Sequence, residues 1–361
     1  MAGGHAATPP RGGEIRAGLI GYGLAGEFFH APLIAATPGM RLAAIVTSDP
    51  ERSRSAAAAH PGARILATAG LLFQHADDFD LVIIATPNRT HVPLTEQALH
   101  ARLAVVVDKP IAATARDGRR LLDEAARSRL LLTVFHNRRW DGDFLTLQRL
   151  LREDRLGTVS RFESRFERWR PVPKPGWRQQ PALEAAGGVL YDLGSHLIDQ
   201  ARLLFGDVTQ VYAELDSRNA GVEVDDDAFV AIAHRSGVRS HLWMSTVAAQ
   251  QGPRLRVLGS RAAYTKYGLD VQESALRSGM PPGKPGWGEE DREMWGRLGV
   301  GDKSLIVPTE PGAYQEFYAG VRRALLEGTA PPVDPADAVG TIEIIEAARR
   351  SAAEARVIHV A

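Results

Sequence analysis

The sequence contains no cysteine. Disulfide bonds, thiolate nucleophiles and cysteine-ligated metal sites are therefore excluded, and zinc-finger and cysteine-protease functions with them. A chain without cysteine suits a reducing compartment, so we expect a cytoplasmic protein.

An excess of charge of either sign is also lacking, as are long apolar runs. Lys and Arg together number 43, as do Asp and Glu, so the formal net charge is zero and neither nucleic acid nor an anionic membrane surface is a favoured partner. The longest apolar segments, such as residues 81–85 and 103–107, are far shorter than the roughly 18 residues needed to cross a bilayer. Residues 1–13 lack the apolar stretch of a secretory signal, and we interpret them as a flexible leader of a soluble protein.

Sequence signatures of metal sites and hydrolases are missing as well. The eleven histidines are scattered without an H-E-x-x-H pattern, and the acidic run Asp225-Asp226-Asp227 falls in an expected turn. No G-x-S-x-G motif surrounds a serine. We therefore predict no metal site and no α/β-hydrolase.

The pattern of the first third of the chain alternates short apolar runs with helix-length segments, and the 361 residues allow two domains. Helices are predicted at 24–36, 90–101 and 114–128, with Thr114 capping the last one. Continuous apolar strands separated by helices predict an α/β Rossmann domain, a doubly wound parallel sheet, over residues 14–135. The predicted strands are residues 15–20, 42–46, 81–85, 104–107 and 130–135.

The pattern changes after Arg138, because several predicted strands follow one another without an intervening helix. They cover residues 159–168, 208–215, 228–234, 238–245 and 254–258. Antiparallel pairing is the simplest arrangement of such strands. With helices predicted at 187–204, 314–326 and 336–354, residues 136–361 form a C-terminal α+β domain with an open, mostly antiparallel sheet, expected to bind substrate and mediate oligomerisation.

A glycine-rich motif stands directly after the first predicted strand and at the start of the first predicted helix. In this context Gly21 permits a tight turn, Gly23 lets the backbone approach a pyrophosphate, and Gly26 allows close packing of helix on strand. A glycine-rich turn without a ligand is the alternative. The predicted dinucleotide-binding residues here are Gly21, Tyr22, Gly23, Leu24, Ala25 and Gly26.

The end of the second predicted strand bears on the choice of cofactor. Enzymes that prefer NAD usually carry an acid there, whereas this chain has Thr47 and Ser48, with Arg52 and Arg54 close behind. Hydroxyls and an arginine accept a 2′-phosphate without charge repulsion. We therefore favour NADP over NAD and place Ser48 and Arg52 at the cofactor, although Arg52 would equally suit the start of an exposed helix.

Three chemically competent side chains stand out in the remainder. Lys109 follows a buried strand, at the carboxyl end of a parallel sheet, where such sheets bind ligands. Asp192 and His196 are four residues apart in a predicted helix and so share one face. Considered separately, Lys109 could be an ordinary exposed lysine, and Asp192 and His196 could form an ordinary exposed ion pair.

These motifs occur together in a known family. The chain resembles the glucose-fructose oxidoreductase/inositol dehydrogenase/MocA-like family of nicotinamide-dependent oxidoreductases over nearly its whole length after the leader. Asp108 replaces the glutamate that usually precedes the lysine, and Ala186 replaces the first of three glycines. The resemblance rests on Gly21-x-Gly23-x-x-Gly26, Ala85-Thr86-Pro87-Asn88-Arg89-Thr90-His91, Asp108-Lys109-Pro110, and Gly187-Gly188 followed by Asp192 and His196.

The resemblance implies a Rossmann domain followed by an α/β domain whose open sheet forms oligomer contacts, as in a homodimer or homotetramer. It also implies active-site roles for Lys109, Asp192 and His196. Segments 28–34, 134–141 and 264–268 look most like the NADP-dependent scyllo-inositol 2-dehydrogenases, which does not fix the substrate. The residues expected along the nicotinamide half of the cofactor are Thr86, Pro87, Asn88, His91 and Asp108.

The expected chemistry is hydride transfer between a secondary alcohol of a cyclic polyol or sugar and the nicotinamide. His196 is the predicted general base, supported by Asp192, and Lys109 stabilises alkoxide character, although Lys109 is an alternative proton carrier. The candidate substrate residues, some of which are also candidates to contact the cofactor, are His136, Asn137, Arg138, Trp140 and, on weaker grounds, Tyr267 and Arg168.

Other functions remain open from the sequence. One alternative is a dinucleotide-binding regulatory protein without turnover, since a fold does not guarantee an activity. Retention of Lys109, Asp192 and His196 together disfavours it, because cofactor binding alone does not require them. Another is a dehydrogenase or reductase of a different sugar or keto compound.

Overall fold

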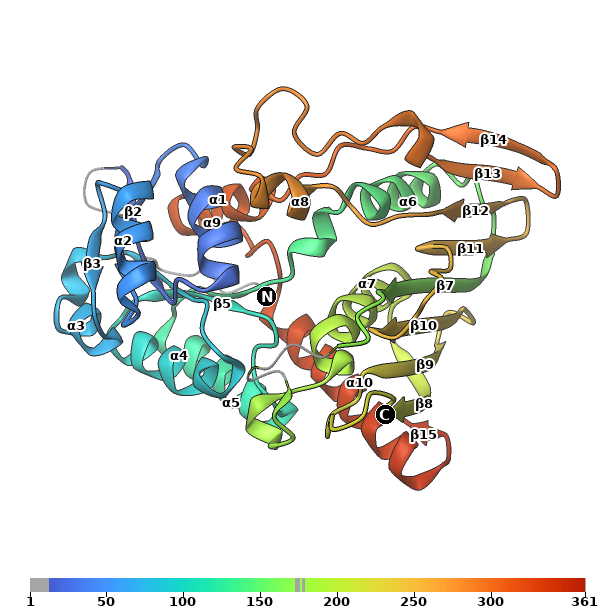
Figure 1. The fold of residues 1–361 in the computed structure, drawn as a ribbon, viewed down its shortest axis with the longest axis horizontal. Coiled ribbons are helices and arrows are strands. Elements are labelled where there is room, and N and C mark those ends of the chain that lie inside the picture. Colours follow the sequence, from blue (N-terminus) through green and yellow to red (C-terminus); the bar gives the residue numbers. More distant parts are fainter. Residues whose placement is uncertain (1–12, 173–175, 177–178, 361) are drawn as a thin grey trace. The chain divides into compact units, whose positions relative to one another are not determined.

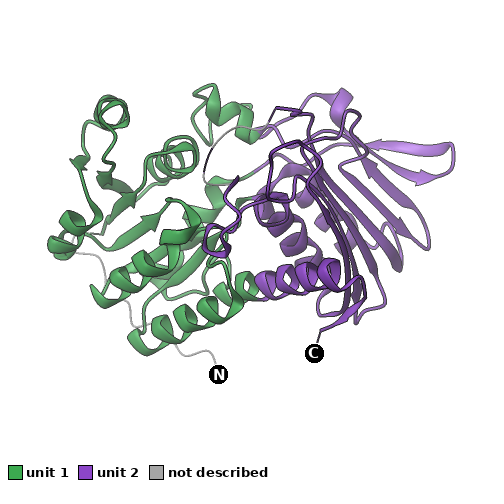
Figure 2. Ribbon diagram, turned by 60° about the horizontal axis from the view of Figure 1, so that its bottom comes forward, with its two compact units in different colours: residues 1–137, 272–287, 313–339 green, residues 138–271, 288–312, 340–361 purple. Residues whose placement is uncertain are grey.

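The computed structural model describes residues 13–172, 176 and 179–360, so the predicted leader, residues 1–13, lies outside the described residues except for Gly13. The chain divides into two compact units (Figure 2). Unit 1 consists of the chain up to Asn137 together with Gln272–Trp287 and Ala313–Val339, and unit 2 consists of Arg138–Val271, Gly288–Gly312 and Gly340–Ala361. Two late segments thus belong to unit 1, a feature that a single boundary near His136 does not represent.

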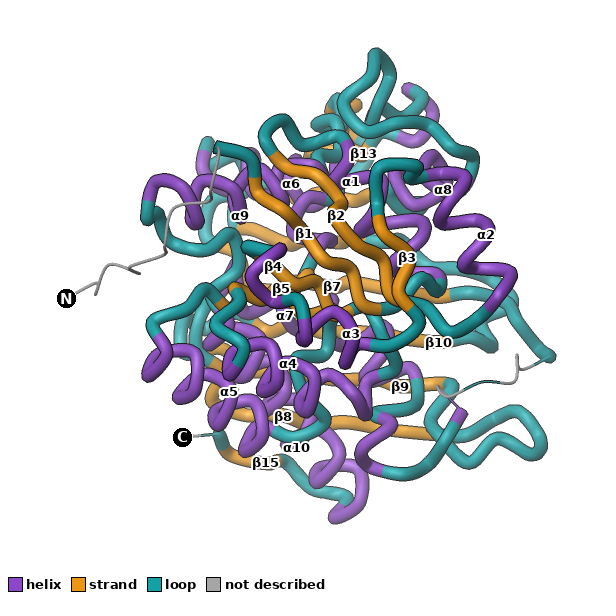
Figure 3. The backbone as a smooth tube through the Cα atoms, turned by 90° about the vertical axis from the view of Figure 1, so that its left-hand side faces the viewer, coloured by secondary structure: helices purple, strands orange, loops and turns teal. Residues whose placement is uncertain are grey.

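Unit 1 is built on a parallel sheet, in which six strands have the order β3-β2-β1-β4-β5-β6 in the described part of the chain. Figure 3 shows β1, β2 and β3 side by side. The predicted doubly wound sheet and its five strands are confirmed, and β3 is an additional, partly exposed edge strand. The strands are β1 (Ile15–Ile20), β2 (Met40–Val46), β3 (Arg64–Leu66), β4 (Leu81–Ile84), β5 (Ala104–Asp108) and β6 (Leu132–Phe135).

Helices cover both faces of this sheet. The main ones are α1 (Ala31–Ala35), α2 (Pro50–Ala59), α3 (Ala69–Gln74), α4 (His91–His100), α5 (Ala115–Ser128), α8 (Gln272–Arg277) and α9 (Gln315–Glu327). Neighbouring α3, α4 and α5 lie on one face, and α1 packs with α9 on the other (Figure 1). The Thr114 hydroxyl accepts the amide of Asp117 at 3.1 Å, which confirms it as the cap of α5. The rings of Phe317 and Tyr318 pack on Phe135, which explains why α9 belongs to unit 1.

The first predicted helix, residues 24–36, is irregular. A π-helical turn over Gly26–His30 precedes α1, and the Ala31 amide donates to Gly26 O, five residues back. Pro32 has no amide hydrogen, and its ring conflicts with a regular helix at the preceding turn. A π turn immediately before the proline accommodates this.

Unit 2 is built on a second sheet. Over the residues that the structure describes, nine strands have the order β14-β13-β12-β11-β7-β10-β9-β8-β15 (Figure 1). Pairing is antiparallel except between β7 and β10, which run parallel, so the predicted mostly antiparallel sheet is confirmed. The strands are β7 (Val159–Glu167), β8 (Val208–Asp216), β9 (Asp227–His234), β10 (Arg239–Ser245), β11 (Leu255–Gly259), β12 (Ala263–Lys266), β13 (Gly296–Val300), β14 (Lys303–Val307) and β15 (Ile358–His359).

One face of this sheet is buried under helices. The helices are α6 (Gly142–Arg152), α7 (Ser195–Phe205) and the part of α10 (Pro335–Glu354) that lies in unit 2 (Figure 1). Along β10, Leu242 and Met244 are buried whereas His241 and Trp243 are partly exposed, the alternation of a sheet with one covered face. No helix among the described residues is both long and apolar enough to cross a membrane.

Candidate active site

The glycine-rich turn joins β1 to the first helical turn, and its three glycines differ in what an added side chain would meet. Gly21 has φ +100°, and a Cβ there would stand 2.3 Å from Ala85 O. A Cβ on Gly26 would lie 2.0 Å from Gly21 O. Beside Gly23, by contrast, Arg52 is the one described residue that would approach a Cβ within 4 Å, at 3.7 Å. The open space at Gly23, at the carboxyl end of a parallel sheet, fits the approach of a pyrophosphate.

The carboxyl end of β2 carries hydroxyls followed by a capped helix. Ser48 is exposed, and Thr47 Oγ1 accepts the amide of Asp49 at 3.4 Å. The Asp49 carboxylate caps α2, accepting the amides of Glu51 and Arg52 at 2.9 and 3.0 Å. Both amides lower the pKa of Asp49, and the amide of Arg52 has the larger effect. The acid nearest the strand end is thus bound to its own helix, and Arg52 reaches toward Gly23.

The carboxyl end of β4 is closed by a polar turn. Thr90 Oγ1 lies 2.7 Å from both Thr86 Oγ1 and Pro87 O, and Asn88 is buried. His91, the first residue of α4, directs both ring nitrogens at backbone carbonyls, at 2.7 Å from Pro110 O and 2.9 Å from Thr86 O. The predicted residues of the β4 and β5 ends therefore lie together in unit 1.

Lys109 follows β5 on that adjoining turn. Asp108 Oδ1 accepts the Lys109 amide at 2.8 Å, and the Lys109–Pro110 peptide bond is cis. Both side chains are partly exposed. The structure therefore places Lys109 at the carboxyl end of the sheet, on the same edge as the glycine-rich turn, as parallel strands require.

Asp192 and His196 belong to unit 2, where the predicted helix 187–204 starts with a π turn. Asp192 lies in the turn Leu190–Gly194, and His196 lies in the first turn of α7. The entry is held by Asp225, whose Oδ2 accepts the Leu190 amide at 2.6 Å. Burial raises the pKa of Asp225 and the Leu190 amide opposes this. A Cβ on Gly188, at φ +89°, would stand 2.1 Å from the same carboxylate, so glycine is required at this position.

A buried ion pair and the hydrogen bonds of a buried glutamine hold α7 in place, three and four residues after His196. Asp199 pairs with Arg139 through two contacts of 2.6 and 2.8 Å, and both side chains are buried. Gln200 donates to Arg138 O at 2.8 Å and accepts from Arg254 at 3.0 Å. The helix that presents His196 is thus anchored by charged groups on its covered side.

The predicted substrate residues lie at several places. His136 and Asn137 are buried at the end of unit 1, and Trp140 is partly exposed in unit 2. The guanidinium of Arg138 lies 4.6 Å from the centre of the Phe166 ring and 3.4 Å from Asp141 Oδ2. Tyr267 is 59% exposed in unit 2. Their contact with substrate stays a prediction.

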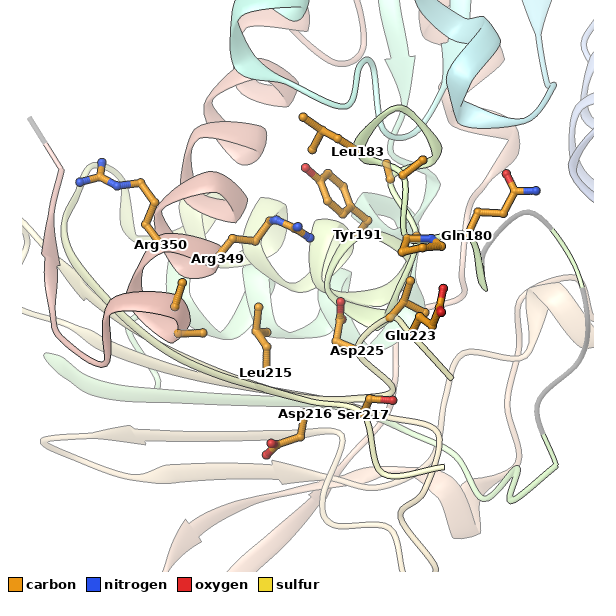
Figure 4. A pocket seen from close by; sticks show the side chains of 17 residues that line it. Gln180, Leu183, Tyr191, Leu215, Asp216, Ser217, Glu223, Asp225, Arg349 and Arg350 are labelled. Carbon is orange, nitrogen blue, oxygen red and sulfur yellow. The ribbon is translucent and has the colours of Figure 1, made fainter. Parts of the chain in front are cut away.

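A cavity of about 580 Å³ lies elsewhere in unit 2 (Figure 4). Tyr191, Asp225 and Arg349 are among its lining residues, and Figure 4 shows the Arg349 side chain extending toward Tyr191. Neither Asp192 nor His196 lines it. We therefore do not assign the catalytic residues to this cavity.

Several supporting residues were not predicted from the sequence. The sequence predicts only a turn at Asp225, whereas its carboxylate holds the start of the π turn, and no sequence pattern predicts the pairing of Asp199 with Arg139. The one sequence signal for the buried ion pair is the close spacing of the charged residues Arg138, Arg139 and Asp141. Among the described residues, no group of three or more His, Asp or Glu is arranged to hold a metal ion.

Comparison with known proteins gives the family. Residues 15–136 match the model of the oxidoreductase family, NAD-binding Rossmann fold, and residues 148–360 match the model of its C-terminal alpha/beta domain. An uncharacterized oxidoreductase of Escherichia coli, YdgJ, is 41% identical over 341 residues, covering 94% of this chain and 96% of the relative. The scyllo-inositol 2-dehydrogenase (NADP(+)) IolW of Bacillus subtilis is 34% identical over 350 residues, 95% of each chain.

A solved structure agrees with the sequence comparison. The Bacillus subtilis protein YvaA has a TM-score of 0.92 and 33% identity, with 98% of this chain and 100% of that chain covered. Both units thus have counterparts along the full length of a relative. This chain belongs to the glucose-fructose oxidoreductase/inositol dehydrogenase/MocA oxidoreductase family and carries its NAD(P)-binding Rossmann domain.

Proposed function

We propose that this protein is an NADP-preferring dehydrogenase that acts on a secondary alcohol of a cyclic polyol or sugar, with scyllo-inositol as the first candidate. The observation that carries the proposal is the edge of the parallel sheet, where the open position at Gly23 and Lys109, directly after β5, lie at the same carboxyl end. The 34% identity to a scyllo-inositol 2-dehydrogenase supports the substrate class.

The environment of β2 supports NADP over NAD. The Asp49 carboxylate is engaged with the amides of α2, and the Arg52 guanidinium lies beside Gly23. A 2′-phosphate bound there would meet Ser48 and Arg52 rather than a carboxylate directed at the ribose. Arg52→Ala is expected to raise the KM for NADP about tenfold or more and to leave the KM for NAD within about threefold. Equal loss with both cofactors would remove the assignment.

The proposed chemistry assigns one role to each catalytic side chain. A bound nicotinamide would supply the acceptor for the hydride of the alcohol carbon. His196 removes the hydroxyl proton, Asp192 supports the charged imidazole, and Lys109 donates a hydrogen bond to the reacting oxygen as it gains negative charge. Lys109 as the proton carrier is the competing assignment.

The polyol would be held by hydrogen-bonding groups and an apolar ring face. We propose His136, Asn137 and Trp140 for this role, with the exposed Tyr267, which directly follows β12. Such a set of polar groups with an aromatic surface is typical of a sugar site. Arg138 is a weaker candidate, because its guanidinium is already stacked on Phe166.

We also propose that the uncovered face of the nine-stranded sheet joins two copies of the chain. A row of cross-strand neighbours runs over this face, with the Arg165 guanidinium 3.9 Å from the centre of the Trp243 ring and the tilted Phe229 ring 5.1 Å from that ring. Aromatic and arginine side chains, which are partly exposed here, are enriched in protein interfaces. Trp243→Glu is expected to reduce the mass measured by light scattering to that of one chain, and an unchanged mass would contradict this interface.

The test of the activity is NADPH formation at alkaline pH across a panel of inositols and aldoses, repeated with NAD. Lys109→Ala is expected to lower kcat at least about 100-fold, and Lys303→Ala, an exposed lysine on β14, serves as the control. Turnover of one polyol that is lost in Lys109→Ala supports the enzyme. Tight cofactor binding without turnover of any compound would instead favour the regulatory protein.

A further inference from the structure

His91 occupies an unusual position at the start of α4. Its side chain is about 1% exposed, and its ring bridges the turns that follow β4 and β5. Nδ1 lies 2.7 Å from the carbonyl oxygen of Pro110, and Nε2 lies 2.9 Å from the carbonyl oxygen of Thr86. One buried ring thus contacts both turns, one of which carries Lys109.

The chemistry of the two partners constrains the protonation of the ring. A backbone carbonyl oxygen accepts hydrogen bonds and cannot donate one, whereas a neutral imidazole has a single N–H. In the neutral form one nitrogen lone pair would therefore face a carbonyl lone pair at 2.7 or 2.9 Å. Only the imidazolium, with a hydrogen on each nitrogen, donates to both oxygens, and such charge-assisted hydrogen bonds are short and strong.

The charged groups that face His91 include a compensating anion. Burial, the largest effect, lowers the pKa of His91, as does Lys109, whereas Asp108 and the two carbonyls raise it, and the net direction is downward. A charged ring at neutral pH therefore requires the two carbonyl hydrogen bonds and Asp108 to outweigh burial. His30 also faces this cluster, and burial lowers the pKa of His30 to about 4, so it is neutral at physiological pH. Asp108 therefore supplies a negative charge on the same turn as Lys109.

We propose that His91 is a buried imidazolium that fastens the turn after β4 to the turn after β5 and so positions Lys109. Its role is that of a positioning residue, because both ring nitrogens are bound to the backbone. A neutral ring would release one of the two turns. The effect on catalysis rests on the proposed function of Lys109, whereas the charge state of His91 does not.

The charge state is measured by nitrogen-15 NMR of the full-length chain with ring-labelled histidine at pH 7.5. An unperturbed histidine, with a pKa near 6.5, is about 90% neutral there. We expect one slowly exchanging ring with a hydrogen on both nitrogens, absent from His91→Gln and present in His100→Gln, a control at the exposed end of α4. Contacts of its ring protons with Pro110 identify the signal even if the variant does not fold. A single N–H on His91 would overturn the proposal.

The positioning role is measured by kinetics and binding on the same variants. For His91→Gln we expect kcat to fall about tenfold and its pH profile to move, with the Kd for NADP, from fluorescence titration, within about threefold of wild type. His100→Gln should match the wild type in each. A His91→Gln enzyme with unchanged kcat and pH profile would contradict the role. If the wild type turns over none of the alcohols, the proposed function fails, and the NMR measurement still decides the charge of His91.

Discussion

The Arg139 guanidinium and the Asp199 carboxylate are joined at two points in the interior of unit 2. Arg139 Nε donates to Asp199 Oδ2 at 2.8 Å, and a terminal nitrogen donates to Oδ1 at 2.6 Å. Asp199 lies three residues after His196 on α7. The pair therefore ties the helix that carries the proposed base to the segment that follows β6.

Removing one member of this pair is expected to be far more costly than removing both. Asp199→Leu or Arg139→Met alone removes one charge of a buried ion pair and leaves the other charge buried, and each should lower the free energy of unfolding by about 3–5 kcal/mol. The double variant should lose clearly less than the sum of the two. Urea unfolding followed by circular dichroism measures all three.

The matched control is an exposed ion pair. Arg127 and Glu124 on α5 lie 2.7 Å apart, with Arg127 65% exposed. Arg127→Met should change stability by no more than about 0.5 kcal/mol. If Asp199→Leu unfolds at the same urea concentration as this control, the buried pair has no role in holding α7.

Much of the fold could be predicted because local patterns coincide with tertiary structure. The apolar runs of β1, β4 and β5 are buried on both faces, so the sequence periodicity identified them. The short edge strands β3 and β14 carry exposed side chains and gave no such signal. The return of α9 to unit 1 depends on Phe317 and Tyr318 meeting Phe135, a contact between residues about 180 positions apart, for which local patterns give no signal.

The candidate site was predictable to the extent that its residues stand in contiguous motifs. The glycine-rich turn and the lysine after β5 were found because each follows a strand directly. The hydrogen bonds that hold the segment carrying Asp192 and His196 could not be predicted. Asp225 binds Leu190 across 35 positions and Arg139 binds Asp199 across 60. Hydrogen bonds of this kind depend on packing and leave no spacing rule in the sequence.

Two of the glycines, Gly23 and Gly21, should separate cofactor binding from folding. Gly23→Ala meets open space in the protein but occupies the approach to the pyrophosphate, so we expect the Kd for NADP to rise about tenfold or more with little change in stability. Gly21→Ala places a Cβ 2.3 Å from Ala85 O at φ +100°, and should cost at least about 2 kcal/mol. Cofactor titration and thermal unfolding distinguish the two. A Gly23→Ala protein that binds NADP as tightly as wild type would exclude this mode of binding.

His30 is expected to contribute to unfolding in acid. Its Nδ1 lies 2.6 Å from the Tyr318 hydroxyl, and burial lowers the pKa of His30 from 6.5 to about 4. The unfolded chain therefore binds this proton first, so the stabilisation is present above about pH 6.5 and is lost as the pH falls toward 4. This lowering of the pKa corresponds to a loss of about 3 kcal/mol in the free energy of unfolding at low pH.

The variant that tests this is His30→Gln, which keeps a polar side chain beside Tyr318 and does not titrate. Its free energy of unfolding should fall less between pH 6.5 and pH 4 than that of the wild type, measured by urea unfolding at each pH. His100→Gln, at a histidine 70% exposed, should retain the wild-type slope. Parallel slopes for the wild type and His30→Gln would show that another group causes the loss.

The assignment of proton transfer to His196 predicts a change in the pH dependence of the reaction as well as its rate. A histidine base is active only when it is neutral, so the wild-type kcat for alcohol oxidation should rise with pH and level off once the base has lost its proton. His196→Asn should lower kcat by about 100-fold or more and abolish that rise, while the Kd for NADP stays within about threefold. Because asparagine can still donate and accept hydrogen bonds, loss of activity reports on the proton rather than on packing. Full turnover of His196→Asn at every pH would instead assign proton transfer to Lys109. Substitution of Lys109 would then remove the pH dependence of kcat.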